Sequence, residues 1–519
     1  MHIHLHDLVA TAASRWGDAP ALTARARTLG YDELWSAVAG FGAALQSLGV
    51  GRGERVAIHL DKRIETVVAI FGASVADCAF VPINPLLRAP QVRHIVADSG
   101  ARVLITTSER LGLLGDEIDA LDALAHVVLV GGERPAGSAA LRPTVHAWDA
   151  LADGRAPSPP AAIDLDTAAI LYTSGSTGRP KGVVLSHRNL LAGAVSVCRY
   201  LRNDEHDCIL AALPLSFDAG FSQLTTGFLA GAHVVLLDYL LPGDVVRSCA
   251  AHGVTGLTGV PPLWIQLAEQ SWPPEVTERM RYVANTGGRL PRVTLDRMRA
   301  TFPNAEPFLM YGLTEAFRST YLDPAEVEQR PDSIGKAIPN AEILVVRADG
   351  RPCGPGEEGE LVHRGALVAK GYWNDPERTA ERFRPLPWDR TGEPAVFSGD
   401  LVVRDDDGFL YFVGRNDEMI KTSGYRVSPT EVEEAAHATG LVRDAVALGV
   451  EDPRLGQQIV LVVSPPEGAE LDPDALRAEL RRQLPGYMVP RRLHVRPALP
   501  RNPNGKLDRT QVRAEVTQP

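Results

Sequence analysis

Residues 173–182 are rich in groups that bind phosphate. The ten residues read TSGSTGRPKG, with apolar runs on both sides. This pattern predicts a strand, a tight loop and a second strand. Glycines let the backbone approach a ligand closely, and backbone N–H groups, hydroxyls and an ammonium group suit phosphate oxygens. The stretch lacks the spacing of a Walker loop. We therefore interpret it as a different anion-binding loop, with a plain hairpin as the alternative.

More polar loops follow short apolar runs further along the chain. Residues 216–221, 287–289 and 311–315 each come directly after or close to such a run. In an open α/β sheet, ligands bind beyond the carboxyl ends of the strands. We therefore expect these loops to gather at one edge of a sheet and to form a binding site there.

The elements that must position these loops alternate between strand and helix patterns from about residue 56 to residue 311. This alternation predicts doubly wound α/β sheets. Residues 132–164 are rich in Pro, Ala and Gly and predict a surface connection. From about residue 335, short strands with turns predict an antiparallel β subdomain. We therefore expect a large N-terminal domain over residues 1–415 and a small α+β domain over residues 416–519.

The composition excludes several classes of protein. Of the 519 residues, 45% are hydrophobic and 23% are charged, as in soluble globular proteins. No apolar stretch is long enough to cross a bilayer, and we see no secretory signal. The five scattered cysteines indicate reduced thiols and a cytoplasmic location. The net charge of −11 argues against nucleic-acid binding.

The N-terminus is rich in histidine, with His2, His4 and His6 at alternating positions. Such a stretch could hold a metal ion. Because no cysteine lies nearby, we expect a solvated leader instead.

Several motifs in a fixed order identify a family. Beside the loop at 173–182, the chain contains YGLTE at 311–315, FSGD at 397–400, GRND at 414–417 and PNGK at 503–506. Together they resemble the AMP-forming adenylating ligases, which include acyl-CoA synthetases, the amino-acid adenylation domains of nonribosomal peptide synthetases, and luciferases. The resemblance covers nearly the whole chain.

The resemblance implies two half-reactions. A substrate carboxylate attacks the α-phosphate of ATP, which gives an acyl-adenylate and pyrophosphate. The small domain then rotates, a pantetheine thiol attacks the adenylate carbonyl, and AMP leaves. Residues 421–426 would line the thiol channel, although Gly424 also suits a simple turn.

The resemblance also implies which residues bind the nucleotide. The hydroxyls and Lys181 of the first loop would hold the β and γ phosphates, Tyr311 would stack on adenine, and Asp400 and Arg415 would bind the ribose. FSGD carries Ser where the family has Thr. The full set expected to bind ATP is Thr173, Ser174, Gly175, Ser176, Thr177, Gly178, Lys181, Gly287, Gly288, Arg289, Tyr311, Gly312, Asp400 and Arg415.

Catalytic roles follow in the same way. Thr314 would contact the α-phosphate, and Glu315 would hold Mg²⁺, which prefers hard oxygen ligands. Lys506 would neutralise the charge that builds between the carboxylate and the α-phosphate. Asp417 would be the hinge residue of the small domain.

Asp218 is the residue that points to a substrate class. The segment FDA at 217–219 resembles amino-acid-activating members, in which this carboxylate pairs with the substrate ammonium. A buried carboxylate needs a cationic partner, and a protein arginine is the alternative to a substrate. Arg318 would contact a second polar group of the substrate, lie against the nucleotide, or pair with Asp218. In the last case, Asp218 would no longer indicate an amino-acid substrate. The pocket residues expected by position are Phe217, Ala219, Ser222, Gly259, Ala284, Thr286, Met310, Arg318 and Ser319.

The identity of the thiol acceptor, a carrier protein or CoA, is also left open. The similar free-standing ligases include exosortase-associated types and others that load an amino acid onto a carrier protein in antibiotic pathways, including macrolactam pathways. A basic face on the C-terminal domain would suit an acidic carrier protein, CoA phosphates or plain solvent. The arginines concerned are Arg477, Arg481, Arg482, Arg491, Arg492, Arg496, Arg501 and Arg509.

We therefore predict a ligase that activates a small amino acid as its aminoacyl-AMP and transfers it to the phosphopantetheine thiol of a carrier protein. An acyl-CoA synthetase that joins a non-amino carboxylic acid to CoA is the alternative. A non-catalytic binding protein is disfavoured by the combination of Lys181, Glu315, Asp400 and Lys506.

Overall fold

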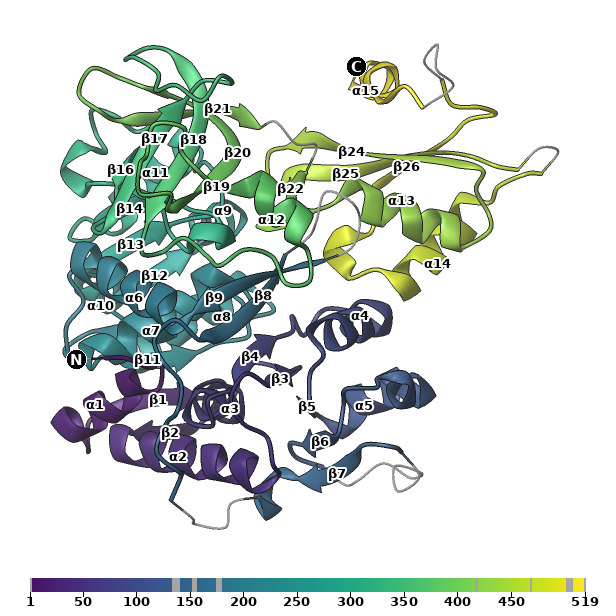
Figure 1. Cartoon of the computed structure of the whole chain (residues 1–519). Coiled ribbons are helices and arrows are strands. Elements are labelled where there is room, and N and C mark those ends of the chain that lie inside the picture. Colours follow the sequence, from purple (N-terminus) through teal and green to yellow (C-terminus); the bar gives the residue numbers. More distant parts are fainter. Residues whose placement is uncertain are drawn as a thin grey trace. The chain divides into compact units, whose positions relative to one another are not determined.

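The computed structural model describes residues 2–132, 141–151, 156–173, 180–415, 419–466, 469–500 and 507–517. The chain divides into two compact units, and each has its own hydrophobic core (Figure 1). The first unit comprises Met1–Pro85, Arg93–Tyr172 and Gly182–Gly414, and the second comprises Leu86–Val92, Thr173–Lys181 and Arg415–Pro519. Among the described residues, no helix combines the length and the apolar character that a bilayer crossing requires.

One sheet of the first unit contains seven strands among the described residues: β3 (Arg55–Ile58), β4 (Ala79–Pro82), β5 (Val103–Thr106), β6 (His126–Leu129), β7 (Thr144–Ala147), β8 (Thr167–Thr173) and β9 (Lys181–Ser186). Its order is β7-β6-β5-β3-β4-β8-β9, and the pairs from β7 to β8 are parallel. Strands are added on both sides of β3, which is the doubly wound arrangement.

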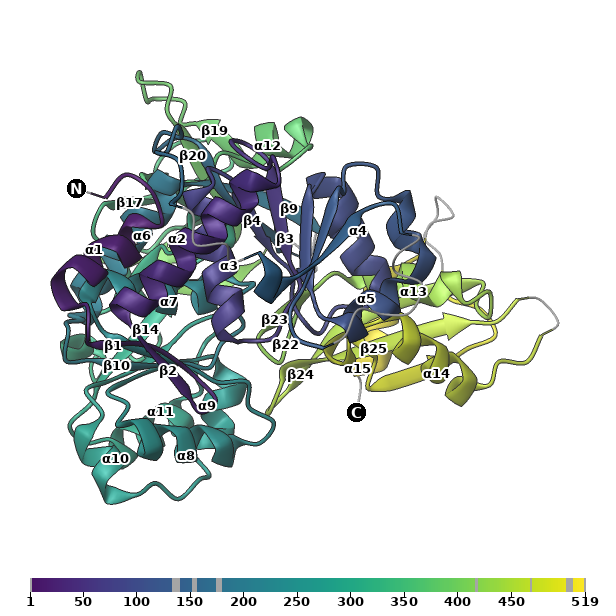
Figure 2. The same cartoon turned by 90° about the horizontal axis from the view of Figure 1, so that it is seen from below.

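Helix α3 (Ile64–Val75) contacts β3 and β4 of this sheet, and α2 (Tyr31–Ser47) packs against α3 (Figure 2). A Cβ atom at Gly42 would lie 2.4 Å from Val75 Cγ1, and one at Gly72 would lie 2.9 Å from Phe41 Cδ1. The two glycines therefore allow the helix backbones to approach. Helices α4 (Ala89–Ser99) and α5 (Ser108–Leu114) follow along the chain.

The second sheet has a parallel part that carries most of the predicted site. It consists of β1 (Pro20–Ala24), β10 (Cys208–Ala211), β11 (His233–Leu236), β12 (Gly256–Gly259), β13 (Tyr282–Asn285) and β14 (Glu306–Tyr311). The order is β1-β11-β10-β12-β13-β14, and β2 (Arg27–Gly30) pairs antiparallel with β1. The accompanying helices are α1 (Asp7–Trp16), α6 (His187–Leu201), α7 (Asp218–Ala230), α8 (Pro242–His252), α9 (Pro261–Leu267), α10 (Pro274–Arg279) and α11 (Arg292–Thr301).

Antiparallel strands continue the same sheet beyond β14. They are β15 (Thr320–Leu322), β16 (Ser333–Ala337), β17 (Ala341–Val346), β18 (Glu358–Gly365), β19 (Phe383–Pro385), β20 (Pro394–Arg404) and β21 (Leu410–Arg415), with helix α12 (Pro376–Arg382) between β18 and β19. The order from β14 is β15-β16-β21-β20-β18-β17, and β19 pairs with β20. The predicted antiparallel strands are therefore present, but β15 pairs directly with β14, so they extend the parallel sheet rather than form a sheet of their own.

The second unit is a small α+β body. Its described strands are β22 (Ile420–Thr422), β23 (Tyr425–Val427), β24 (Asp444–Asp452), β25 (Gly456–Ser464) and β26 (Arg492–Val495), in the order β23-β22-β25-β24 with β26 parallel to β25. Its helices are α13 (Pro429–Ala438), α14 (Pro473–Gln483) and α15 (Arg509–Thr517). Ser423 and Gly424 both have positive φ, 52° and 82°, as a two-residue hairpin turn requires. The turn therefore accounts for Gly424 by itself.

The α/β fold predicted from the sequence is confirmed. Helix α13 covers residues 429–438, and Ser186 caps α6 by accepting a hydrogen bond from the Asn189 backbone N–H at 3.2 Å. The connection predicted over residues 132–164 is partly wrong, because it contains β7, which pairs with β6.

The solvated N-terminal leader is also wrong. The exposed fractions of His4 and His6 are 8% and 6%, and Leu5 is fully buried. The Leu5 backbone N–H donates to His187 Nδ1 at 3.0 Å. The partners of this segment lie far away in the sequence, so local composition could not reveal the packing.

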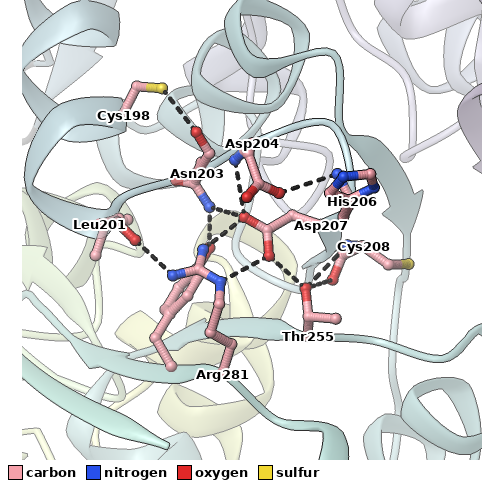
Figure 3. A network of polar contacts seen from close by, with 10 residues as sticks. Cys198, Leu201, Asn203, Asp204, His206, Asp207, Cys208, Thr255 and Arg281 are labelled. Carbon is pink, nitrogen blue, oxygen red and sulfur yellow. Dashed lines mark hydrogen bonds and ion pairs between the residues drawn. The ribbon is translucent and has the colours of Figure 1, made fainter.

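A buried ion pair fixes the amino ends of three neighbouring strands (Figure 3). Asp207, Thr255 and Arg281 directly precede β10, β12 and β13. Arg281 donates through Nε and Nη2 to the two Asp207 oxygens at 2.9 and 2.5 Å, and the Thr255 hydroxyl donates to Asp207 at 2.7 Å. Burial alone would raise the pKa of Asp207, but hydrogen bonds from Arg281, Asn203 and Thr255 outweigh it and lower the pKa. This network lies at the edge opposite to the predicted site.

Candidate active site

The predicted site residues follow the carboxyl ends of four adjacent strands. Asp218 comes after β10, Gly259 ends β12, Thr286 follows β13, and Tyr311 ends β14. These strands are neighbours in the order β10-β12-β13-β14. The Thr286 backbone N–H donates to the Gly259 carbonyl at 3.0 Å, which joins two of these ends directly. The structure therefore brings the predicted loops to one sheet edge.

Two of the predicted nucleotide residues are in contact. The Tyr311 hydroxyl donates to Asp400 Oδ2 at 2.5 Å, and both side chains are buried. The Asp400 backbone N–H donates to Ser398 Oγ at 3.0 Å, and this hydroxyl donates to the Leu361 carbonyl at 2.6 Å. The Ser398 hydroxyl thus holds Asp400 in place.

The predicted metal ligand is buried and oriented by a tyrosine. Glu315 lies in a short 3₁₀ turn, η4 (Thr314–Ala316), with an exposed fraction of 5%. The Tyr372 hydroxyl donates to Glu315 Oε1 at 2.7 Å. The Glu315 carbonyl also accepts a hydrogen bond from the Ala369 backbone N–H at 2.9 Å. A buried carboxylate held in one orientation fits a hard divalent cation such as Mg²⁺.

A strained turn separates Glu315 from Arg318. Phe317 has φ 58° and ψ −47°, and the Arg318 backbone N–H donates to the Ala316 carbonyl at 2.6 Å, which is the geometry of a γ-turn. A positive φ is costly for a bulky residue. The turn persists because the Phe317 ring is fully buried against α6, where a Cβ at Gly193 would lie 2.5 Å from Phe317 Cδ1. Strain of this kind is common at functional sites.

Arg318 and Asp218 form a buried pair. Arg318 Nη1 donates to Asp218 Oδ2 at 3.2 Å and to the Phe317 carbonyl at 2.9 Å. The exposed fractions of the two side chains are 3% and 15%. Burial raises the pKa of Asp218, and the attraction of Arg318 opposes this only in part, while Glu315 adds to it. Of the alternatives left open for Arg318, the pairing with Asp218 is the one that the structure shows.

Arg318 also contacts a residue that sequence reasoning missed. The Tyr200 hydroxyl, on α6, interacts with Arg318 and donates to Met310 Sδ at 3.0 Å. Burial raises the pKa of Tyr200 to about 12, with Arg318 acting in the opposite direction. Among the described residues, the buried Nε of Arg318 has no hydrogen-bond partner. An unsatisfied buried donor is costly, and a ligand oxygen would satisfy it.

The remaining residues expected in the substrate pocket differ in how deeply they are buried. Ser222, Ala284, Thr286, Met310 and Ser319 are buried, whereas Phe217 and Ala219 are half-buried at the start of α7. A Cβ at Gly259 would lie 2.8 Å from Trp264 Nε1, so a side chain there would point toward α9. Trp264 itself is fully buried and donates to the Ala284 carbonyl at 3.1 Å.

The glycine turn after β13 is compact. Gly287 has φ 76°, and Asn285 Nδ2 donates to the Gly288 carbonyl at 2.8 Å. Arg289 is exposed and pairs with Asp332 at 2.5 Å. In the next loop, a Cβ at Gly312 would lie 3.1 Å from Arg318 Cα, so this position has little room for a side chain.

Several predicted residues lie outside the described part of the chain. They are Ser174, Gly175, Ser176, Thr177, Gly178, Asp417 and Lys506, together with the side chain of Arg415. Of the first loop, Thr173 ends β8, and its buried hydroxyl has no hydrogen-bond partner among the described residues. Lys181 begins β9. The roles of these residues stay predictions.

Tyr200, Tyr372 and Trp264 were not found from the sequence. Each contacts a predicted residue through packing between distant segments. Tyr372 and Glu315 are 57 positions apart in the sequence, and Tyr200 and Met310 are 110 positions apart. None of the three lies in one of the glycine-rich or acidic motifs. Only a three-dimensional arrangement could reveal them.

Comparisons with known proteins agree with this arrangement. The model of the AMP-binding enzyme family matches residues 9–373, and the model of the AMP-binding enzyme C-terminal domain matches residues 431–506. The chain is 33% identical over 490 residues to feruloyl-CoA synthase from an Amycolatopsis species, which covers 93% of each chain.

Two solved structures are similar over almost their whole length. A double mutant of o-succinylbenzoate CoA synthetase from Bacillus subtilis has a TM-score of 0.82 at 26% identity and covers 98% of both chains. An artificially fused adenylation–PCP di-domain NRPS from Klebsiella oxytoca has a TM-score of 0.79 at 25% identity, over 94% of this chain and 93% of that one. The chain therefore belongs to the AMP-binding enzyme family, as an AMP-forming acid–thiol ligase that uses ATP.

Proposed function

We propose that the protein activates a small amino acid as its aminoacyl-AMP and transfers it to the phosphopantetheine thiol of a carrier protein. The observation that carries the proposal is the position of Asp218, a largely buried carboxylate at the start of α7, beyond the carboxyl end of β10. The pairing with Arg318 at 3.2 Å weakens the argument from Asp218. It does not remove the argument, because burial still raises the pKa of this carboxyl beside one guanidinium. A substrate ammonium group beside Asp218 would supply the missing positive charge.

The charges around Asp218 support the same conclusion. Asp218 and Glu315 are both acidic and influence each other, and Arg318 is the basic group that acts on Asp218 among the described residues. With both carboxylates ionised, these three side chains carry a net charge of −1. Because charges interact strongly where water is excluded, a cationic group on the substrate would be favoured over a neutral one.

Several residues expected around the substrate are small. Ser222, Ala284 and Thr286 are small and buried, and Met310 is held by Tyr200. Small side chains leave room for a substrate, so these residues would admit a small amino acid without fixing its size. These contacts support a class of substrates and do not single out one amino acid.

The catalytic roles are part of the proposal. Glu315, oriented by Tyr372, would coordinate Mg²⁺, whose charge would offset that of the phosphates. Thr314 would contact the α-phosphate, and Lys506 would stabilise the charge of the transition state. The hinge at Asp417, between domains 1–415 and 416–519, belongs to the same proposal.

A carrier protein is the proposed acceptor. The adenylation–PCP fusion named above is similar over most of this chain. The basic face is weaker than the sequence suggested, because Arg477, Arg482, Arg496 and Arg509 are paired with acidic neighbours in the second unit. Arg481, Arg491 and Arg492 remain exposed there. These three arginines would meet an acidic carrier protein.

The test is ATP–pyrophosphate exchange with a panel of small amino acids, each paired with the same acid lacking its amino group. The proposal expects exchange with amino acids only, and a loss of exchange in Asp218→Asn. A hydrogen bond to a charged group contributes about 1.5–3 kcal/mol, so kcat/KM should fall roughly 10- to 150-fold. Exchange with deaminated acids that survives Asp218→Asn would overturn the proposal.

A second candidate is an acyl-CoA synthetase for a non-amino carboxylic acid. It is favoured by the Arg318–Asp218 pair, which already gives the buried carboxylate a cation, and by the 33% identity to a feruloyl-CoA synthase. AMP release driven by CoA, compared with release driven by phosphopantetheinylated carrier proteins, separates the two candidates.

A further inference from the structure

The N-terminal segment brings two histidines and an aspartate together inside the first unit. His4 and His6 are buried, and Asp7 begins α1. One ring nitrogen from each histidine and one carboxylate oxygen of Asp7 all lie within 4.8 Å of one another. His4 Nδ1 is 4.0 Å and His6 Nε2 is 3.6 Å from the carboxylate. The sequence offered the histidine-rich stretch as a possible metal site but favoured a solvated leader, and the fold supplies the geometry.

The histidine rings are held by their other nitrogens. His4 Nε2 lies 2.8 Å from the Ala162 carbonyl oxygen, which can only accept a hydrogen bond. In the neutral ring, the proton of His4 is therefore on Nε2, and Nδ1 would present a lone pair toward Asp7. His6 Nδ1 lies 3.0 Å from Ser74 Oγ, which leaves Nε2 as the nitrogen that faces Asp7. Metal-ligating histidines are commonly held in this way by a carbonyl or another oxygen.

The gaps between these atoms are too long for hydrogen bonds. At 3.6 and 4.0 Å, neither ring nitrogen is hydrogen-bonded to the Asp7 carboxylate. Zn–N and Zn–O bonds of about 2.0–2.2 Å place the ligand atoms of a tetrahedral site roughly 3.3–3.6 Å apart. Small side-chain rotations would therefore close the cluster around an ion. A direct hydrogen bond between either ring and the carboxylate would require a similar movement. The Asp7 oxygen Oδ2 already accepts hydrogen bonds from the backbone N–H groups of Ile3 and His4, at 2.7 and 2.9 Å.

We propose that His4, His6 and Asp7 bind a transition-metal dication of the Zn²⁺ class. Two imidazoles and one carboxylate are the ligands that such ions prefer, and a fourth position would be left for water. The Asp7 side chain is 26% exposed, which gives an ion access from solvent.

The ion would fasten the N-terminal segment to the core. His6 contacts Ser74 on α3, His4 contacts Ala162, and Leu5 between them donates to His187 at the start of α6. His187 Nδ1 accepts that hydrogen bond and is therefore not a ligand through this atom. Metal binding by the folded state alone stabilises that state. The expected role is structural, and the site uses none of the residues proposed for catalysis.

The test uses the untagged full-length protein, stripped with a chelator and titrated with Co²⁺ and with Zn²⁺. We expect a single Co²⁺ ion per chain, read from its visible d–d absorption, and displacement of Co²⁺ by Zn²⁺. His6→Gln and Asp7→Asn should each weaken binding by at least about a hundredfold. Both metals should raise the midpoint of thermal unfolding of the wild type but not of these variants.

His2→Gln is the matched control, because His2 lies in the same segment but outside the cluster. It should bind Co²⁺ with wild-type affinity. Retention of ATP–pyrophosphate exchange by Asp7→Asn would show that this variant is folded. The proposal is overturned if the wild type binds no Co²⁺, if His6→Gln and Asp7→Asn bind as tightly as the wild type, or if His2→Gln loses as much affinity as they do.

Discussion

Arg318 Nη1 donates a hydrogen bond to Asp218 Oδ2 at 3.2 Å, across 100 residues of sequence. The two side chains come from different elements: Asp218 opens helix α7, and Arg318 follows the strained turn at Phe317. The pair joins the residue that we propose to select the substrate to the segment that carries Glu315. A substitution of Arg318 should therefore change the ionisation of Asp218.

Arg318→Met should make amino-acid binding strongly dependent on pH. Without the guanidinium, burial and Glu315 raise the pKa of Asp218 further, so less carboxylate is present at a given pH. KM for the amino acid should rise most at low pH and recover as the pH increases, and Arg318→Lys should restore part of the loss. The measurement is KM in the exchange assay across pH.

Arg292→Met serves as the control, since it alters only an exposed ion pair with Asp296. A pH dependence of Arg318→Met identical to that of the wild type would mean that Arg318 does not act through Asp218.

Tyr311→Phe should weaken ATP binding while keeping the aromatic ring. The substitution removes the donor to the buried Asp400 carboxylate. Leaving a buried acceptor without this partner costs about 1–3 kcal/mol, so KM for ATP should rise roughly 5- to 150-fold, with a smaller change in kcat.

Tyr411→Phe makes the same change on β21, where the hydroxyl donates to Asp405 at 3.2 Å, and should leave KM for ATP unchanged. Equal effects of the two variants would argue against a specific role of Tyr311.

Gly220→Ala should destabilise the start of α7. A Cβ at this position would lie 2.0 Å from the Pro214 carbonyl oxygen, so the helix that carries Asp218 must move. Overpacking of this kind costs about 1–3 kcal/mol. Gly40→Ala, in the interior of α2 with nothing within 4 Å, should instead stabilise by about 0.5–1 kcal/mol. Chemical denaturation of both variants checks the opposite signs.

Glu431→Gln should stabilise the second unit at alkaline pH. Burial, with repulsion from Glu434, raises the pKa of Glu431 from 4.5 to about 8, and its Oε2 has no hydrogen-bond partner among the described residues. Because the folded state then binds more protons than the unfolded state, stability decreases as the pH rises from about 4.5 to about 8. Glutamine removes this loss.

Calorimetry should therefore show a larger gain in unfolding temperature for Glu431→Gln at about pH 9 than at about pH 5. Glu451→Gln changes an exposed carboxylate in the same unit and should show no such trend. A gain that is independent of pH would contradict the assignment.

The sequence was informative where function restricts local residue types. Motifs in the sequence identified Asp218, Tyr311, Glu315 and Asp400, and they named the family. The fold brings the first three to one sheet edge, and Asp400, in β20, accepts a hydrogen bond from Tyr311.

Contacts between distant segments were not readable. Nothing in the pattern around Tyr200 indicated that its hydroxyl would meet Arg318, and nothing at the N-terminus indicated that His6 would reach Ser74. The choice among the partners of Arg318 required the same long-range information. Side-chain packing, rather than local periodicity, decides these cases.

The Asp207–Arg281 network has a consequence for the history of this fold. Its hydrogen bonds hold together the amino ends of β10, β12 and β13, so the carboxyl ends of these strands need not contribute much to the stability of the sheet. The loops there can change length and residue type without loosening the sheet. A sheet held together in this way could keep its fold while its binding loops change to accept different acids. The segments after β10, β12 and β13 are therefore the places to vary in a library selected for new substrates.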